Sequence, residues 1–88
     1  MNRIAEFGKV VRAVRRERGL TQELLAEKAN LHVNSISFLE RGLTPPALDT
    51  ICAIADALGV SVSSLMVQME AGSEKSVQAR AEKNPQPH

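Results

Sequence analysis

Residues 21–42 read TQELLAEKANLHVNSISFLERG, and this stretch predicts two short helices joined by a sharp turn. Thr21 is a favourable N-cap, so the first helix should begin directly after it. Asn30 is among the few residues other than glycine that tolerate a positive φ, which lets the chain turn there. His32 stands where the second helix would be capped, and Gly42 is a natural residue to end it. We therefore expect a helix-turn-helix unit in this stretch.

The chain on either side of this unit predicts three more helices. Before Gly19, apolar residues recur three and four positions apart, which is the pattern of one amphipathic helix. Pro45 and Pro46 prevent the unit's second helix from continuing, and a fourth helix is expected after them, over about residues 47–58. A fifth helix is expected over about residues 61–70.

The predicted architecture is all-α, a compact five-helix bundle that forms one domain. We place this domain at residues 1–70, with the helix-turn-helix unit at about 21–41 and the last helix at about 61–70. Leu48 is expected to face the core from the fourth helix. Residues 71–88 are poor in large apolar side chains, and we expect them to form a flexible tail.

Composition narrows the class of protein further. The chain has 88 residues, enough for one small domain, and its 2% aromatic content suits packed helices better than sheets. The single cysteine, Cys52, excludes an internal disulfide and is expected to be a buried, inert thiol. We find no residue spacing typical of a catalytic or metal site, no signal peptide and no apolar run long enough to span a membrane. The sequence thus predicts a cytoplasmic protein that is not an enzyme, binds no cofactor or metal and has no membrane partner.

Charge is distributed unevenly along the chain, although the net charge is only +1. Residues 1–46 contain eight basic and five acidic residues, whereas residues 47–70 contain three acidic residues and no Lys or Arg. This asymmetry predicts one face that meets phosphate groups and another face for a different partner.

The helix-turn-helix unit has the features of one that reads DNA, including the small residue Ala26 where its two helices must cross closely. Three stretches resemble the phage Cro and C1 repressor family: GLTQELLAEKA at 19–29, ISFLERG at 36–42 and ALGVS at 57–61. The resemblance covers about residues 5–68. It implies a five-helix DNA-binding domain, a homodimer and an inverted-repeat DNA site.

Four side chains are candidate base readers, because they lie on or beside the outward face of the helix expected at 33–41. They are Val33, Asn34, Ser37 and Phe38, and they coincide with the base-contacting positions of the family that the chain resembles. Asn34 carries the donor and acceptor that match adenine N6 and N7, and the Ser37 hydroxyl can donate or accept. Val33 and Phe38 can pack against thymine methyl groups, although Phe38 could instead pack beneath the following loop.

Three further residues are candidates for contacts with DNA phosphates. Arg41 projects from the end of the same helix. Thr21 and Gln22 stand at the start of a helix, where free N–H groups and the helix dipole attract an anion, and the resemblance implies that both meet a phosphate. The resemblance also implies a pair between Arg15 and Glu40 that orients the reading helix without touching bases.

The segment 47–70 is the better dimer face, because without cations it would repel DNA. Within it, Leu65, Met66 and Met69 are the predicted dimer contacts, since one short helix there carries more apolar surface than a small core is expected to absorb. We interpret the chain as a homodimeric transcriptional repressor that binds double-stranded DNA at a palindromic operator. Two other interpretations stay open: an antitoxin that also binds a toxin protein, and a protein-interaction module without DNA binding.

Overall fold

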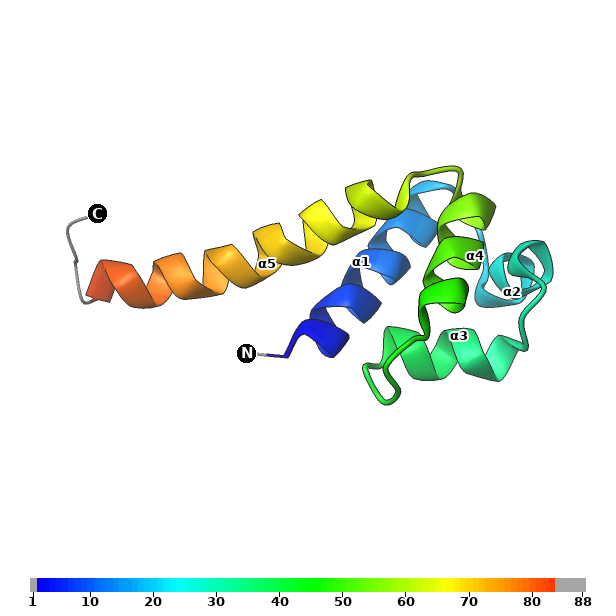
Figure 1. The fold of residues 1–88 in the computed structure, drawn as a ribbon, viewed down its shortest axis with the longest axis horizontal. Helices are drawn as coiled ribbons and strands as arrows, with labels where there is room; N and C mark the ends of the chain where they lie inside the picture. Colours follow the sequence, from blue (N-terminus) through cyan, green and yellow to red (C-terminus); the bar gives the residue numbers. More distant parts are fainter. Residues whose placement is uncertain (1, 84–88) are drawn as a thin grey trace.

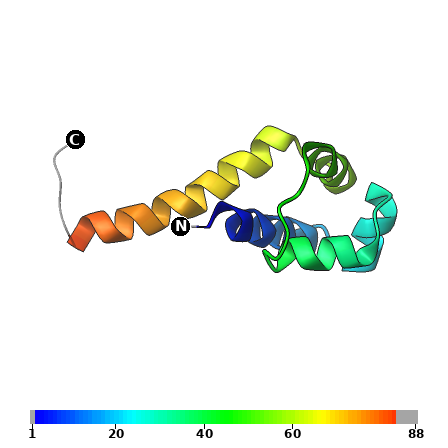
Figure 2. The ribbon, with the colours of Figure 1, turned by 60° about the horizontal axis from the view of Figure 1, so that its bottom comes forward.

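The computed structural model of the protein describes the backbone of residues 2–83 and the side chains of residues 2–72. Five helices form this part of the chain and no strand occurs within it, so the predicted all-α fold is confirmed. The helices are α1 (Arg3–Glu17), α2 (Gln22–Ala29), α3 (Val33–Glu40), α4 (Leu48–Leu58) and α5 (Val62–Lys83). The start of α5 packs on α1, and its later turns extend past the bundle (Figure 1; Figure 2).

α2 and α3 form the helix-turn-helix unit, and local interactions fix the turn between them. Thr21 Oγ1 accepts a hydrogen bond from the Leu24 N–H at 3.1 Å, which caps α2. Asn30 ends α2 with a φ of 56°, the left-handed conformation that the sequence predicted there. His32 Nδ1 accepts a hydrogen bond from the Asn34 N–H at 3.1 Å and so caps α3. The direction of α3 is therefore set by residues on both sides of a short turn.

The core contains apolar side chains from all five helices. Its buried members are Phe7, Val11, Val14, Leu25, Ala26, Ile36, Leu39, Ile54, Ala55, Leu58 and Leu65. Full burial of each large side chain contributes roughly 1.5–3 kcal/mol to the free energy of unfolding. α3 packs on α1 and α2, while α2 also packs on α4, so the buried face of the helix-turn-helix unit is held by the rest of the bundle.

Two residues of α4 that the sequence placed inside lie outside. Leu48 is 72% exposed, because it is the first residue of α4 and stands beyond the edge of the core. Cys52 is exposed as well, on a flank of α4 that faces solvent, so the prediction of a buried thiol is wrong. Apolar periodicity gives the direction of a side chain around a helix, but it does not give the place where the core ends.

The last helix is longer than the sequence predicted. α5 continues to Lys83, whereas the pattern of apolar residues ends near residue 70. The segment 73–83 is rich in Ala, Glu, Lys, Gln and Arg, and these residue types favour a helix through their intrinsic propensity. The helical backbone there thus agrees with local propensity. Residues 84–88 of the predicted tail lie outside the described part of the chain.

α1 and α3 approach each other closely at Gly8, which is buried. A Cβ atom at this position would lie 2.3 Å from the Leu39 carbonyl oxygen and 2.8 Å from the Glu40 carbonyl oxygen. Glycine is therefore required for the C-terminal end of α3 to rest on α1 at this distance.

The described residues contain neither a single helix that could span a membrane nor a cluster of metal-binding side chains. No single helix is long and apolar enough to cross a membrane; Leu48–Leu58 and Val62–Gly72 reach that length and composition only together, as a pair bent by 102°. No group of three or more His, Cys, Asp or Glu side chains lies close enough to hold a metal ion within the part of the chain that was searched.

Candidate DNA-binding surface

The outward face of α3 carries the side chains that the sequence predicted as base readers. Ile36 is fully buried and anchors the opposite side of the helix. Asn34 is exposed, Phe38 is 40% exposed, and Ser37 is half-buried. Val33 is also half-buried and packs against the core, so it offers less surface than its neighbours. α3 therefore presents a mixed polar and aromatic face at the outside of the bundle.

Arg41 lies on this same face and contacts Phe38. Its guanidinium carbon is 5.3 Å from the centroid of the Phe38 ring, a cation–π geometry. Arg41 Nε also donates a long hydrogen bond, 3.4 Å, to the Ser37 carbonyl oxygen. No carboxylate pairs with Arg41 among residues 2–72, and its side chain is exposed. The guanidinium thus keeps most of its donors available to a ligand.

The start of α2 lies beside α3 and is held to it by a side chain. Thr21 is exposed and serves as the cap described above. Gln22 Nε2 donates a hydrogen bond to Glu40 Oε1 at 3.0 Å, a contact that the sequence analysis did not anticipate. The Gln22 side chain therefore fixes the start of α2 against the end of α3.

Arg15 and Glu40, which the resemblance pairs, form a buried bidentate ion pair between α1 and α3. Arg15 Nε donates to Glu40 Oε2 at 2.6 Å, and Arg15 Nη2 donates to Glu40 Oε1 at 3.0 Å. Arg15 Nη1 donates to the Leu20 carbonyl oxygen at 2.8 Å. The hydrogen bonds to Glu40 raise the pKa of Arg15 although burial acts to lower it, so Arg15 stays charged. Both residues are less than a tenth exposed, and together they fix the orientation of α3.

Two positioning features of this site escaped the sequence analysis. Gly8 interrupts the apolar stripe of α1, and an isolated glycine in a helical pattern is itself a sign of close packing. The Gln22–Glu40 hydrogen bond had no comparable signal, because the two residues are 18 positions apart and belong to different helices.

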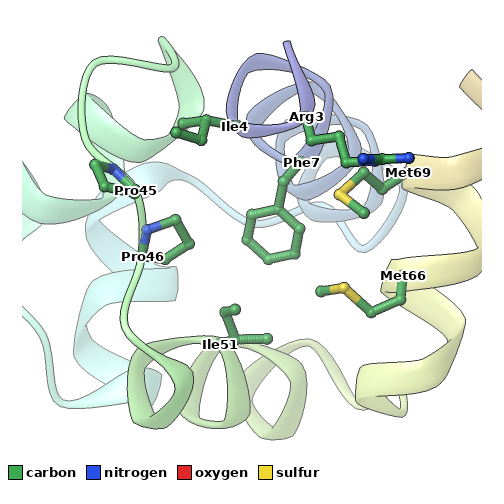
Figure 3. Close-up of a pocket in the computed structure, with 8 residues that line it drawn as sticks. All are labelled: Arg3, Ile4, Phe7, Pro45, Pro46, Ile51, Met66 and Met69. Carbon is green, nitrogen blue, oxygen red and sulfur yellow. The ribbon is translucent and has the colours of Figure 1, made fainter. Parts of the chain in front are cut away.

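An apolar groove lies between α1, α4, α5 and the loop before α4 (Figure 3). It has a volume of about 210 Å³ and is lined by Arg3, Ile4, Phe7, Pro45, Pro46, Ile51, Met66 and Met69. Met66 and Met69, two of the predicted dimer contacts, are half-buried on its wall. Leu65 is 0% exposed inside the core of a single chain, so it cannot meet a partner, which corrects that part of the prediction.

Comparison with known proteins gives sequence relatives that regulate genes. A helix-turn-helix family model matches residues 11–65. The immunity repressor protein of Bacillus phage phi105 is 46% identical over 59 residues, which are 67% of this chain and 41% of that protein. Control protein C.BamHI of Bacillus amyloliquefaciens is 41% identical over 61 residues, 68% of this chain and 75% of that protein. The chain thus spans less than half the length of the phage repressor.

Solved structures with a similar fold include two gene-control proteins. The restriction-modification controller protein C.AhdI from Aeromonas hydrophila superposes with a TM-score of 0.69 at 32% identity, over 70% of this chain and 94% of that one. The clp gene regulator ClgR from C. glutamicum gives a TM-score of 0.74 at 30% identity, over 83% and 92% of the two chains.

Proposed function

Because the chain belongs to the helix-turn-helix family of the Cro/C1 type, whose members are DNA-binding transcriptional regulators, we propose that it represses transcription by binding a specific DNA site with α3. One observation carries the proposal: a helix with an exposed outward face, containing Asn34, Phe38 and Arg41, is mounted rigidly on the bundle by the buried Arg15–Glu40 pair. A rigid helix with an exposed face matches the shape of the DNA major groove.

Base reading is assigned to the outward face of α3. Asn34 is exposed near the N-terminal end, where such helices meet base edges, and its amide can bond adenine N6 and N7 together. Ser37 has a hydroxyl that accepts or donates, so it adds contact with little discrimination. Val33 and Phe38 offer apolar surface to thymine methyl groups, with Phe38 the more exposed of the two.

Phosphate binding is assigned to the start of α2. The backbone N–H groups of its first turn and the positive end of its dipole favour an anion beside Thr21 and Gln22. Gln22, at this phosphate site, donates a hydrogen bond to Glu40 at the end of α3. This bond couples the phosphate contact to the reading helix. A phosphate held there would set the register of α3 in the groove.

We propose further that two copies of the chain pair across the apolar groove that contains Met66 and Met69. The groove is lined by apolar side chains apart from Arg3, and residues 47–70, which supply Ile51, Met66 and Met69, contain no Lys or Arg. A two-fold axis there would match the symmetry of an inverted repeat, which requires the two α3 helices to stand about 34 Å apart, one turn of DNA.

Pairing is tested by sedimentation of the protein at tens of micromolar and by a matched pair of α5 variants. Met69→Glu should give a folded monomer whose affinity for the selected DNA site falls at least about a hundredfold, because single domains of this type bind weakly. Val67→Glu changes a 64% exposed residue of the same helix that is not part of the groove, so it should remain a dimer. A monomeric unmodified protein, or a dimer that only Val67→Glu disrupts, would contradict this arrangement.

The proposed function is tested by selecting bound sites from a pool of random double-stranded DNA. We expect an inverted repeat whose half-sites are one helical turn apart, with preference at the base pairs that face α3. Absence of any enriched sequence would contradict sequence-specific binding and would favour the protein-interaction interpretation, in which Val33 and Phe38 meet another protein.

A further inference from the structure

Phe38 and Arg41 form a stacked pair on the reading face whose arrangement the proposed function does not require. The Phe38 side chain is 40% exposed at the outside of the bundle, so part of its aromatic surface is open to a ligand. Arg41 folds back along the helix onto this ring, with 5.3 Å between guanidinium carbon and ring centroid. Its Nε is tied to the Ser37 carbonyl oxygen at 3.4 Å. Helical side chains lean towards the N-terminus, which is the direction in which Arg41 reaches Phe38.

The stacked arrangement leaves a defined part of each group available to a ligand. With the guanidinium carbon over the ring and Nε held by the backbone, the two terminal nitrogens remain as a fork of donors. Such a fork matches O6 and N7 of guanine, the two acceptors that this base shows in the major groove. The exposed part of the Phe38 ring is apolar and belongs to the residue that the guanidinium contacts, so it suits a methyl group on the neighbouring base.

We propose that Phe38 and Arg41 act as one unit that reads a pyrimidine carrying a C5 methyl group next to a guanine. The inference rests on the proposed function, namely that α3 lies in the major groove. Arg41 bonds guanine, and Phe38 both holds the guanidinium in place and packs against the methyl group. Arg41 then contributes to specificity, in place of the phosphate contact that the sequence predicted for it.

Recognition of the C5 methyl group also makes binding sensitive to cytosine methylation. Thymine and 5-methylcytosine carry the same methyl group at the same position in the major groove, whereas uracil and cytosine lack it. A unit that recognises the methyl group therefore responds to cytosine methylation at this position of the site. Methylation of DNA would strengthen binding there rather than block it.

The test uses the full chain and the best half-site sequence obtained from the random DNA pool. Four duplexes differ only at the base pair beside guanine, whose pyrimidine is thymine or uracil opposite adenine, or cytosine or 5-methylcytosine opposite guanine. We expect the affinity to be about fourfold higher for thymine than for uracil, and about fourfold higher for 5-methylcytosine than for cytosine. A change of about fourfold is the effect of burying one methyl group. Both affinity ratios should fall to one in the Phe38→Ala variant. This variant should still fold, because the Phe38 side chain is 40% exposed, and thermal unfolding checks that it does.

Arg41→Lys is the matched variant for the guanine contact, since it keeps the charge and removes the planar fork. Loss of guanine preference by at least about tenfold, with binding to random duplex nearly unchanged, supports the proposal. If Arg41→Ala lowers affinity for all sequences equally and flattens the salt dependence by about one unit, Arg41 is a phosphate ligand and the proposal is wrong. If the unmodified chain selects no site at all, the proposed function itself fails, which is a different result from either of these.

Discussion

Replacing Glu40 with alanine would leave two groups of the helix-turn-helix unit without their acceptor. Arg15 would lose hydrogen bonds of 2.6 and 3.0 Å, and Gln22 would lose one of 3.0 Å. Gln22 is half-buried, so its side-chain amide can form a hydrogen bond with water instead. Arg15 is only 8% exposed and keeps a single hydrogen bond, to the Leu20 carbonyl oxygen. Because a guanidinium group stays protonated in proteins, Arg15 cannot escape the loss by giving up its proton.

The expected cost follows from the burial of the pair. Removing one partner of a buried ion pair costs about 3–5 kcal/mol, and the remaining bond of Arg15 to Leu20 places the Glu40→Ala variant near the lower end. A domain of this size has a stability of roughly 5 kcal/mol, so more than half of it would be lost. The midpoint of thermal unfolding should fall by about 12–24 °C, since each kcal/mol shifts a domain of this size by about 4–8 °C.

Thermal unfolding followed by circular dichroism at neutral pH measures this effect directly. Glu27→Ala, at an exposed position of α2, is the matched control and should change the midpoint by only a few degrees. The double variant Arg15→Met with Glu40→Leu should recover most of the loss, because an apolar pair can replace a buried ion pair. A midpoint for Glu40→Ala within about 3 °C of the unmodified protein would refute the reasoning, since the pair would then contribute no more than surface charges do.

Three other substitutions test separate parts of the account. Gly8→Ala should lower the free energy of unfolding by about 1–3 kcal/mol in urea titration, because its Cβ meets the Leu39 carbonyl oxygen at 2.3 Å; an unchanged midpoint would show that the two helices separate freely. Thr21→Ala should cost about 1 kcal/mol in the same assay through loss of the cap on Leu24, and no cost would mean that water replaces the hydroxyl. Asn34→Ala should weaken binding to the selected site by about 1–3 kcal/mol and relax preference at one base pair in each half-site, while binding to random DNA stays the same.

Local signals were sufficient to predict the helix-turn-helix unit. The caps at Thr21 and His32 and the left-handed Asn30 depend only on residues a few positions away, so a single sequence contains the information. The periodic apolar residues likewise gave all five helices. For the same reason the outward face of α3 followed from the positions of Ile36 and Leu39 alone.

The errors arose where the answer depends on distant parts of the chain. Leu48 and Leu65 are both apolar residues at helical spacing, yet one is 72% exposed and the other 0% exposed, because only the assembled bundle decides where the core ends. The same limit applies to Gly8, whose role depends on a carbonyl group of α3. The contact between Arg41 and Phe38 is allowed by a spacing of three, but nothing in the sequence singles it out.

The central claim is that the chain binds DNA, and its most direct measurement is the affinity of the full chain for a labelled duplex as salt increases. Each phosphate that a Lys or Arg side chain neutralises contributes about −0.9 to the slope of the logarithm of affinity against the logarithm of salt concentration. Residues 1–46 contain eight basic residues, so we expect at least one such contact per chain, two per dimer, and an affinity that falls at least about twelvefold between 50 and 200 mM salt. No binding at 50 mM salt, or an affinity that does not change with salt, would contradict the account.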